Sequence, residues 1–289
     1  MHPHYEDTLR QVTAWARSEP TIHAVIVIGS QARETLPADQ WSDLDLLVLA
    51  DEPRTLLDDA GWIEQFGAPA CTFAEFVPVE FTGWQWFVRR VLYSDLREVD
   101  FSLLPHGLLA QVLAANRALL AKGWRIAYDD SGQLDEQVRA ALAAGSTEAP
   151  PAPPTPEQLQ AVVSELLYHV IWAQKKLRRG ELWAATGCIN GHMRGLLLWL
   201  LEAHTALLAG QPDRMGYNGR FIDRRMTPEA RALLAGAFTR YDAGEAQAAL
   251  GQLFTITHRL AGELCAQAGW PLDEAQFERV KELFFNLCE

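Results

Sequence analysis

Residues Val25 to Ala50, VIVIGSQARETLPADQWSDLDLLVLA, decide the fold of the N-terminal half of this chain. An apolar run is followed by the pair Gly29-Ser30 and a polar segment, and a second apolar run closes the stretch. Short apolar runs bounded by polar turn residues are typical of buried β-strands. The stretch therefore predicts two strands, at about 22–28 and 44–50, joined by a polar connection.

Two aspartates stand at the start of the second predicted strand. Side chains two residues apart on a strand point to the same side of a sheet, so Asp43 and Asp45 are expected to converge while Leu44 and Leu46 enter the core. Carboxylates are depleted in strands, and a pair of them on a rigid strand end suits a hard divalent cation. Mg²⁺ binds such carboxylates together with phosphate oxygens. The pattern predicts a magnesium site.

The Gly29-Ser30 turn offers the complementary feature. Glycine lets the backbone approach a phosphate closely, and the amides of a following helix N-terminus point at the anion. We expect a short helix at 31–35, which Pro37 ends. Beside the aspartate pair, the turn is interpreted as a phosphate contact.

A predicted hairpin further along the chain carries a third carboxylate. Strand patterns at 84–93 and 97–104 flank a turn, and the second alternates so that Asp100 lies on its polar face. A position beside the strand of Asp43 and Asp45 would place three carboxylates around one metal centre.

The remaining segments divide the chain into two parts. Residues 145–156, GSTEAPPAPPTP, contain five prolines and predict an extended, semi-rigid linker. We therefore expect an α/β domain at 1–145, a linker at 146–156 and an α-helical bundle at 157–289, with helix caps at Thr155 and Thr227. Further helices are expected at 5–18, 55–66, 106–121, 133–143, 157–179, 181–209, 228–242, 245–268 and 273–288, and further strands at 71–79 and 124–128.

Composition excludes several classes of protein. The net charge of −12 argues against a general nucleic-acid binder, and residues 1–145 hold 21 Asp and Glu against 11 Lys and Arg. The four cysteines show no paired spacing, so a zinc site is not expected from them. No signal peptide or membrane span is recognised. The expectation is a cytoplasmic protein with no nucleic-acid or membrane partner and an undetermined oligomeric state.

The histidines on predicted helices show no paired metal spacing. They are interpreted as core or surface residues. They are His169, His192, His204 and His258.

The first half carries a recognisable motif. A strand ending in Ile28-Gly29-Ser30, twelve intervening residues and Asp43-Leu44-Asp45-Leu46 resemble the DNA polymerase β-like nucleotidyltransferase superfamily. The whole chain is similar to the aminoglycoside 6-adenylyltransferase (streptomycin adenylyltransferase) family. The similarity is carried by the segments AVIVIGSQAR, GWIEQFG, VLYSDLREVDFSLLP, CINGHMRGLLLWLLE and GYNGRFIDRRM.

The resemblance implies an activity and a set of roles. The family has a nucleotidyltransferase α/β domain followed by a helical domain, holds ATP and an aminoglycoside between them, and transfers AMP to a drug hydroxyl with release of pyrophosphate. It implies that Asp43, Asp45 and Asp100 are catalytic and hold Mg²⁺. The residues expected to contact the nucleotide are Gly29, Ser30, Gln31, Arg33, Asn218 and Arg220.

Two departures from the family leave the acceptor open. Gln31 stands where the family usually has arginine, and Tyr217 where it typically has lysine; Arg33 and Arg220 are nearby cations. The alternatives are a nucleotidyltransferase acting on a lincosamide, another small molecule or a protein hydroxyl, and a non-catalytic nucleotide-binding or antitoxin-like module. Carboxylates that would attract a polycationic aminoglycoside are Glu75, Glu80, Asp95, Glu98, Glu165, Glu202 and Asp223.

Overall fold

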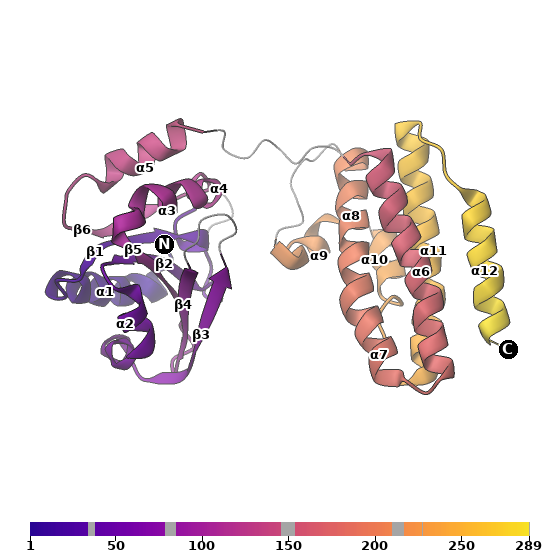
Figure 1. Cartoon of the computed structure of the whole chain (residues 1–289), viewed down its shortest axis with the longest axis horizontal. Helices are drawn as coiled ribbons and strands as arrows, with labels where there is room; N and C mark the ends of the chain where they lie inside the picture. Colours follow the sequence, from indigo (N-terminus) through magenta and orange to yellow (C-terminus); the bar gives the residue numbers. More distant parts are fainter. Residues whose placement is uncertain (34–37, 79–84, 146–153, 210–216, 227, 289) are drawn as a thin grey trace. The chain divides into compact units, whose positions relative to one another are not determined.

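The computed structural model describes residues 1–33, 38–78, 85–145, 154–209, 217–226 and 228–288. The chain divides into two compact units, Met1–Glu148 and Ala149–Glu289. The first contains a β-sheet with helices, and the second contains helices in its described residues (Figure 1). The predicted fold class, an α/β sheet domain followed by a helical bundle, is confirmed.

A mixed six-stranded sheet organises the first unit. Its order is β3-β4-β5-β2-β1-β6. Strands β2 and β5 run parallel, and the other neighbours run antiparallel. The two strands that the opening stretch predicted are confirmed. The strands are β1 (Ile22–Ile28), β2 (Leu44–Ala50), β3 (Pro69–Pro78), β4 (Gln85–Tyr93), β5 (Glu98–Pro105) and β6 (Arg125–Asp129).

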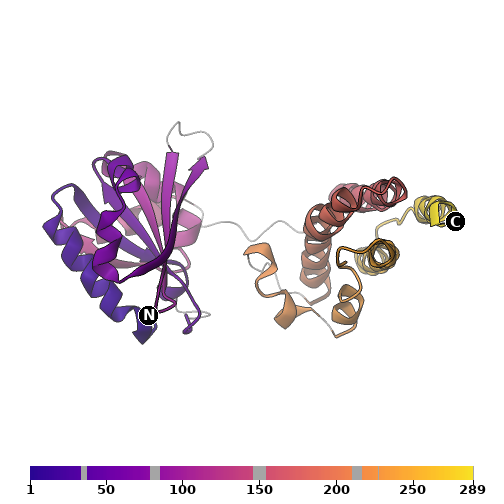
Figure 2. The same cartoon turned by 90° about the horizontal axis from the view of Figure 1, so that it is seen from below.

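Helices cover both faces of this sheet (Figures 1 and 2). On β1, Val25 and Val27 belong to one hydrophobic cluster, while Ile26 and Ile28 belong to another. Alternate side chains of a strand enter opposite layers, and this explains why the strand sequences are continuously apolar. The first cluster is covered by α1 (Glu6–Ser18), α2 (Pro53–Asp58) and a 3₁₀ segment, Gly61–Phe66, and the second by α3 (Leu109–Ala115), α4 (Arg117–Leu120) and α5 (Leu134–Ala143).

The second unit is built from helices that pack around one apolar cluster. Its first helix begins with a capping box in which Thr155 Oγ1 accepts from the Gln158 amide and the Gln158 side chain accepts from the Thr155 amide. The predicted cap at Thr155 is thereby confirmed. The elements are α6 (Pro156–Arg178), α7 (Leu182–Gly187), a π-helical turn (Cys188–Met193), α8 (Arg194–Ala209), α9 (Ile222–Arg225), α10 (Pro228–Leu234), α11 (Ala243–Ala268) and α12 (Glu274–Cys288).

Two helices predicted as continuous in the first unit are broken. The segment 55–66 divides because Asp59 adopts an extended backbone and its carboxylate accepts from the Gly61 amide. The segment 106–121 divides at Asn116, whose ψ of 9° departs from helical values and whose side-chain amide donates to the Val112 carbonyl beside its own backbone amide. In both cases a short polar side chain forms a hydrogen bond with the local backbone where the helix is interrupted.

Two predictions in the second unit also need correction. The helix expected at 228–242 ends at Leu234; beyond it, the Asn190 side chain donates to the Thr239 carbonyl and accepts from the Thr239 amide. The helix expected at 181–209 contains the π-helical turn that carries Asn190. Beyond Leu234, the backbone of Thr239 is thus hydrogen-bonded to the Asn190 side chain and does not continue the helix.

Several predictions fall partly or wholly outside the described residues. These are most of the helix at 31–35, the ends of two strands at residues 79 and 84, the linker residues 146–153 and the cap at Thr227. Residues Gly29–Gln31, at the edge of the first of these, form a 3₁₀ turn. All four cysteines are free. Among the described helices, none is long and apolar enough to cross a membrane.

Candidate functional site

Two neighbouring strands carry the three predicted carboxylates. Asp43 directly precedes β2, Asp45 is its second residue, and Asp100 lies on β5. Because β2 and β5 run parallel with Asp45 opposite Asp100, one carboxylate oxygen from each of the three residues lies within 4.8 Å of the others. The structure therefore brings Asp100 to the pair Asp43 and Asp45, which lies more than fifty residues earlier in the sequence.

Burial and neighbouring carboxylates raise the pKa of two of these acids, Asp45 and Asp100. Burial, followed by the charges of Asp43 and Asp100, raises the pKa of Asp45 to about 7. Burial also raises the pKa of Asp100 to about 6, against the lowering effect of Arg90. Negative charge is thus concentrated where the protein supplies too little positive charge to balance it. A cation bound among these oxygens would relieve that repulsion.

The Gly29-Ser30 turn lies directly against Asp45. Ile28, the last residue of β1, pairs with Asp45 across the sheet, and Gly29 follows with φ of +68°. A Cβ at Gly29 would collide with the Asp45 carboxylate, so both the backbone conformation and the space require glycine. The turn and the carboxylate cluster therefore form one site.

Two polar atoms beside this turn are buried without partners. Among the described residues, neither Ser30 Oγ nor Arg33 Nε has a hydrogen-bond partner. Buried polar atoms are nearly always satisfied. An unpaired hydroxyl of the turn and an unpaired guanidinium nitrogen nearby in sequence suit an anionic ligand such as a phosphate.

The Gln31 side chain forms hydrogen bonds with two backbone groups of the protein. This side chain is buried, its Oε1 accepts from the His2 amide at 3.0 Å, and its Nε2 donates to the Asp43 carbonyl at 3.1 Å. Both ends of this amide are hydrogen-bonded within the protein, and the nucleotide contact expected of Gln31 stays a prediction. Gln31 holds the segment that presents Asp43.

We expect Gln31→Ala to lower the free energy of unfolding by about 1–3 kcal/mol, because it leaves two backbone groups without partners. Urea denaturation followed by circular dichroism measures this. Gln137→Ala is the matched control, since the Gln137 Oε1 has no partner in the described structure. Equal stabilities of the two variants would contradict the role assigned to Gln31.

Arg90 is a site residue that sequence reasoning missed. It lies opposite Asp100 in the β4–β5 hairpin and donates to the Asp100 carboxylate. Its Nε donates to Glu75 at 3.0 Å. The hairpin register, counted outward from the turn at Ser94, could have indicated this pairing. Arg90 is the counter-ion of Asp100 in this structure, and Glu75 is its second partner.

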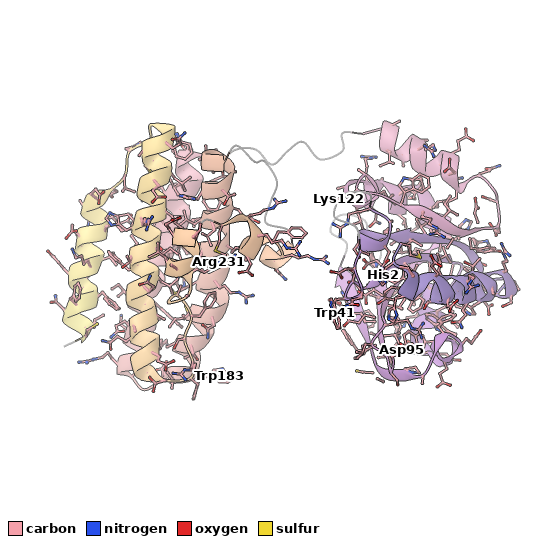
Figure 3. The ribbon with its side chains drawn as sticks, turned by 180° about the vertical axis from the view of Figure 1, so that it is seen from behind. His2, Trp41, Asp95, Lys122, Trp183 and Arg231 are labelled. Atoms are coloured by element: carbon pink, nitrogen blue, oxygen red, sulfur yellow. The ribbon has the colours of Figure 1, made fainter. Side chains whose placement is uncertain are left out.

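Trp41 is a second neighbour that the motif did not indicate. It stands two residues before Asp43 and its side chain is 78% exposed (Figure 3). The Asp39 carboxylate fixes the loop by accepting from the Trp41 amide and the Ser42 hydroxyl. The segment that leads into Asp43 thus exposes a large aromatic ring to solvent.

The remaining expected carboxylates lie in several different settings. In the first unit, Asp95 pairs with Arg97, which lowers its pKa against the effect of burial, and Glu98 is exposed at the start of β5. Glu80 lies outside the described residues. In the second unit the positions are Glu165 on α6, Glu202 on α8 and Asp223 on α9.

Asn218 and Arg220 belong to the second unit. Asn218 has φ of +52° in the turn Tyr217–Gly219, a left-handed conformation that asparagine tolerates better than most residues. Arg220 is exposed, and its guanidinium lies 5.9 Å from the centre of the Phe221 ring. The turn by itself accounts for the asparagine.

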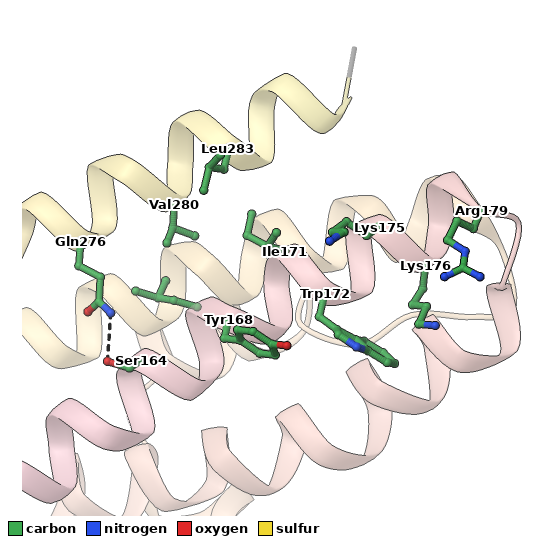
Figure 4. Close-up of a pocket in the computed structure, with 11 residues that line it drawn as sticks. Ser164, Tyr168, Ile171, Trp172, Lys175, Lys176, Arg179, Gln276, Val280 and Leu283 are labelled. Carbon is green, nitrogen blue, oxygen red and sulfur yellow. Dashed lines mark hydrogen bonds between the residues drawn. The ribbon is translucent and has the colours of Figure 1, made fainter.

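A groove of about 510 Å³ lies between α6 and α12 of the second unit (Figure 4). Apolar side chains such as Ile171 and Val280 line its middle, and Lys175, Lys176 and Arg179 line one end. These three side chains are positively charged and would repel a cationic acceptor. The basic end of the groove thus lacks the carboxylates that the sequence analysis proposed for attracting a cationic acceptor.

Comparisons with known proteins show which family this chain resembles. The family described as streptomycin adenylyltransferase matches residues 3–286. An aminoglycoside 6-adenylyltransferase of Bacillus subtilis (strain 168) is 22% identical over 217 residues, which are 74% of this chain and 73% of that protein.

Two solved structures are also similar to the chain. One is an aminoglycoside 6-adenyltransferase from Bacillus subtilis, with 16% identity, coverage of 97% of this chain and 96% of that chain, and a TM-score of 0.47. The other is a nucleotidyltransferase-like protein from Exiguobacterium sibiricum, with 12% identity, coverage of 98% and 89%, and a TM-score of 0.34. Since the family match spans nearly the whole sequence, this chain belongs to the streptomycin adenylyltransferase family of nucleotidyltransferase enzymes.

Proposed function

We propose that this protein transfers AMP from ATP to a hydroxyl of a cationic, aminoglycoside-like acceptor, with Mg²⁺ as cofactor and pyrophosphate as the second product. The observation that carries the proposal is the convergence of Asp43, Asp45 and Asp100 beside the Gly29-Ser30 turn. Carboxylates able to bind metal ions, beside a turn whose hydroxyl could bind a phosphate, are the groups that nucleotidyl transfer requires.

The residues present fit a hard divalent cation. Asp43, Asp45 and Asp100 offer only oxygen donors, the type that Mg²⁺ prefers, and the raised pKa values of Asp45 and Asp100 reflect carboxylate charge that a cation would stabilise. Bound divalent ions supply charge neutralisation for the triphosphate and the departing pyrophosphate.

In this proposal, side chains of the protein bind the phosphates and accept the proton of the acceptor hydroxyl. Ser30 Oγ donates to a phosphate oxygen and Arg33 supplies positive charge, as their missing partners suggest. Asn218 and Arg220 stay candidates for further ligand contact. The acceptor oxygen bonds to the α-phosphorus, the bond from that phosphorus to the pyrophosphate oxygen breaks, and the hydroxyl proton leaves to a carboxylate. Asp100 either receives this proton or serves only as a metal ligand.

The two parts of the chain have different assignments in this proposal. The first domain, residues 1–145, binds ATP and carries out the transfer; the helical domain, 157–289, contributes to acceptor binding. An acidic first half, with 21 Asp and Glu against 11 Lys and Arg in residues 1–145, favours a polycationic acceptor by long-range attraction. Gln31 and Tyr217 leave the identity of that acceptor for experiment.

Pyrophosphate release from ATP and Mg²⁺ tests the proposal. We expect release only with one class of acceptor in a panel of streptomycin, kanamycin and lincomycin, and loss of release in Asp43→Asn. Stimulation by lincomycin alone would move the acceptor outside the aminoglycosides. Absence of both ATP binding and release would contradict the enzyme assignment and favour a non-catalytic nucleotidyltransferase-like module.

A further inference from the structure

A second group of metal-ligating side chains lies in the helical unit. Glu165 and His169 are four residues apart on α6, so they share one face of that helix, and His192 comes from the π-helical turn that packs against it. One ligand atom from each of these residues lies within 4.8 Å of the others. π-Helical turns are frequent at functional sites.

The geometry of the three side chains already approaches a coordination sphere. His192 Nε2 lies 3.0 Å from Glu165 Oε1, and the rings of His169 and His192 are 4.3 Å apart between centroids. In a tetrahedral zinc site, where each metal–ligand bond is near 2.1 Å, neighbouring ligand atoms are separated by about 3.4 Å. Small side-chain rotations would bring the ligand atoms, which lie within 4.8 Å of one another, to this separation.

A backbone hydrogen bond favours metal binding by His169. Its Nδ1 lies 2.8 Å from the Glu165 carbonyl oxygen, which can only accept, so Nδ1 carries the hydrogen and donates it. In the neutral ring this leaves the lone pair on Nε2, and metal-binding histidines usually donate their other nitrogen in this way. The side chains of Glu165 and His192 are nearly half exposed, so an ion can reach them from solvent.

A different cluster of possible ligands, in the first unit, is less suited to binding a metal ion. His23, Asp51 and His106 also approach one another, but both ring nitrogens of His23 are held by carboxylates, Asp130 at 2.7 Å and Asp51 at 2.8 Å. These hydrogen bonds favour the protonated ring, which has no lone pair for a metal. His169 differs because a neutral carbonyl occupies only one of its nitrogens.

We propose that Glu165, His169 and His192 form a binding site for a borderline transition-metal ion of the Zn²⁺ class, separate from the carboxylate cluster. Two imidazoles and one carboxylate are a zinc-type donor set, and a water completes the four positions. The nitrogen ligands distinguish it from the oxygen-only set of Asp43, Asp45 and Asp100, which favours Mg²⁺. The ion would connect α6 to the π-helical turn and take Glu165 out of the candidate acceptor carboxylates.

Cobalt titration of the full-length, untagged protein tests this site. Co²⁺ in tetrahedral nitrogen and oxygen coordination gives visible d–d bands, and excess Mg²⁺ occupies the carboxylate cluster. We expect one equivalent of Co²⁺ to produce the bands and Zn²⁺ to displace it. Zn²⁺ is also expected to raise the Tm of the wild type by about 2 °C or more.

Three variants and one control assign the ligands. His169→Ala and His192→Gln should lose the bands and the Zn²⁺-induced Tm shift, and Glu165→Gln should weaken Co²⁺ binding at least tenfold. His258→Ala is the matched control, because His258 also pairs with a glutamate, Glu274, at 2.8 Å on this unit. Circular dichroism checks the folding of each variant.

Two results would overturn the proposal. One is the absence of bands in the folded wild type; the other is bands that persist in folded His192→Gln or His169→Ala. Retention of the bands in the Asp45→Asn variant is expected, since that residue belongs to the other metal site.

Discussion

Asp45→Asn is expected to lower the rate of ATP-dependent AMP transfer by roughly a thousandfold, since metal-assisted charge stabilisation contributes several kcal/mol to such reactions. Asp45 lies close to the two other acids in the cluster and against the Gly29 turn. An amide cannot neutralise a divalent cation as a carboxylate can. Initial rates of pyrophosphate release at saturating ATP and Mg²⁺ measure the effect.

Asp58→Asn is the control for this substitution. Asp58 has a side chain that is 61% exposed and pairs with Arg54 on a surface helix, an interaction of little energetic weight. We expect wild-type rates from this variant. A rate for Asp45→Asn within tenfold of the wild type, in folded protein, would show that Asp45 does not hold the catalytic cation.

The same substitution is expected to stabilise the protein when divalent cations are removed. The pKa of Asp45 is raised to about 7 from its ordinary value of 3.8, chiefly by burial and then by Asp43 and Asp100. The folded state therefore binds more protons than the unfolded state between those values, and stability falls as pH rises through this window. Above about pH 7, ionised Asp45 lowers the free energy of unfolding by its full amount, on the order of 2–4 kcal/mol.

Thermal denaturation in a chelator at pH 5 and pH 8 measures this prediction. Asp45→Asn should exceed the wild type in Tm at pH 8, and the difference should shrink at pH 5. His23, whose pKa is raised first by its hydrogen bond to Asp130, also loses its contribution as pH rises, so the comparison is between the two proteins at each pH. Mg²⁺ should raise the Tm of the wild type more than that of the variant.

A wild-type Tm equal to that of Asp45→Asn at pH 8 in chelator would contradict the buried-charge account. A loss of stability in Asp45→Asn at both pH values would indicate that the carboxylate has structural hydrogen bonds that compensate its burial. Either result would also weaken the case for a cation among these three acids.

The sequence by itself determined the local features of the fold. The continuous apolar runs predicted β1 and β2 with their observed bounds, because a strand buried on both faces needs apolar side chains in both directions. Thr155 predicted a helix start that the capping box confirms. The pattern of Gly29-Ser30 and Asp43-x-Asp45 predicted the family, since these residues depend on strand geometry that is local to the chain.

Only the tertiary structure decided which distant residues meet. The parallel pairing of β2 with β5 sets Asp100 opposite Asp45, and no local preference fixes that choice of neighbour. The Gln31 side chain forms hydrogen bonds with the backbone of His2 and Asp43, because a buried amide must satisfy both its donor and its acceptor.

The same reason explains the features that sequence patterns did not indicate. Asn190 reaches Thr239 across the helical unit, and His192 meets Glu165 and His169 through the packing of the π-helical turn on α6. Hydrogen-bond and metal-ligand partners far apart in sequence are selected by the packing of apolar faces, which brings them close only after the chain has folded.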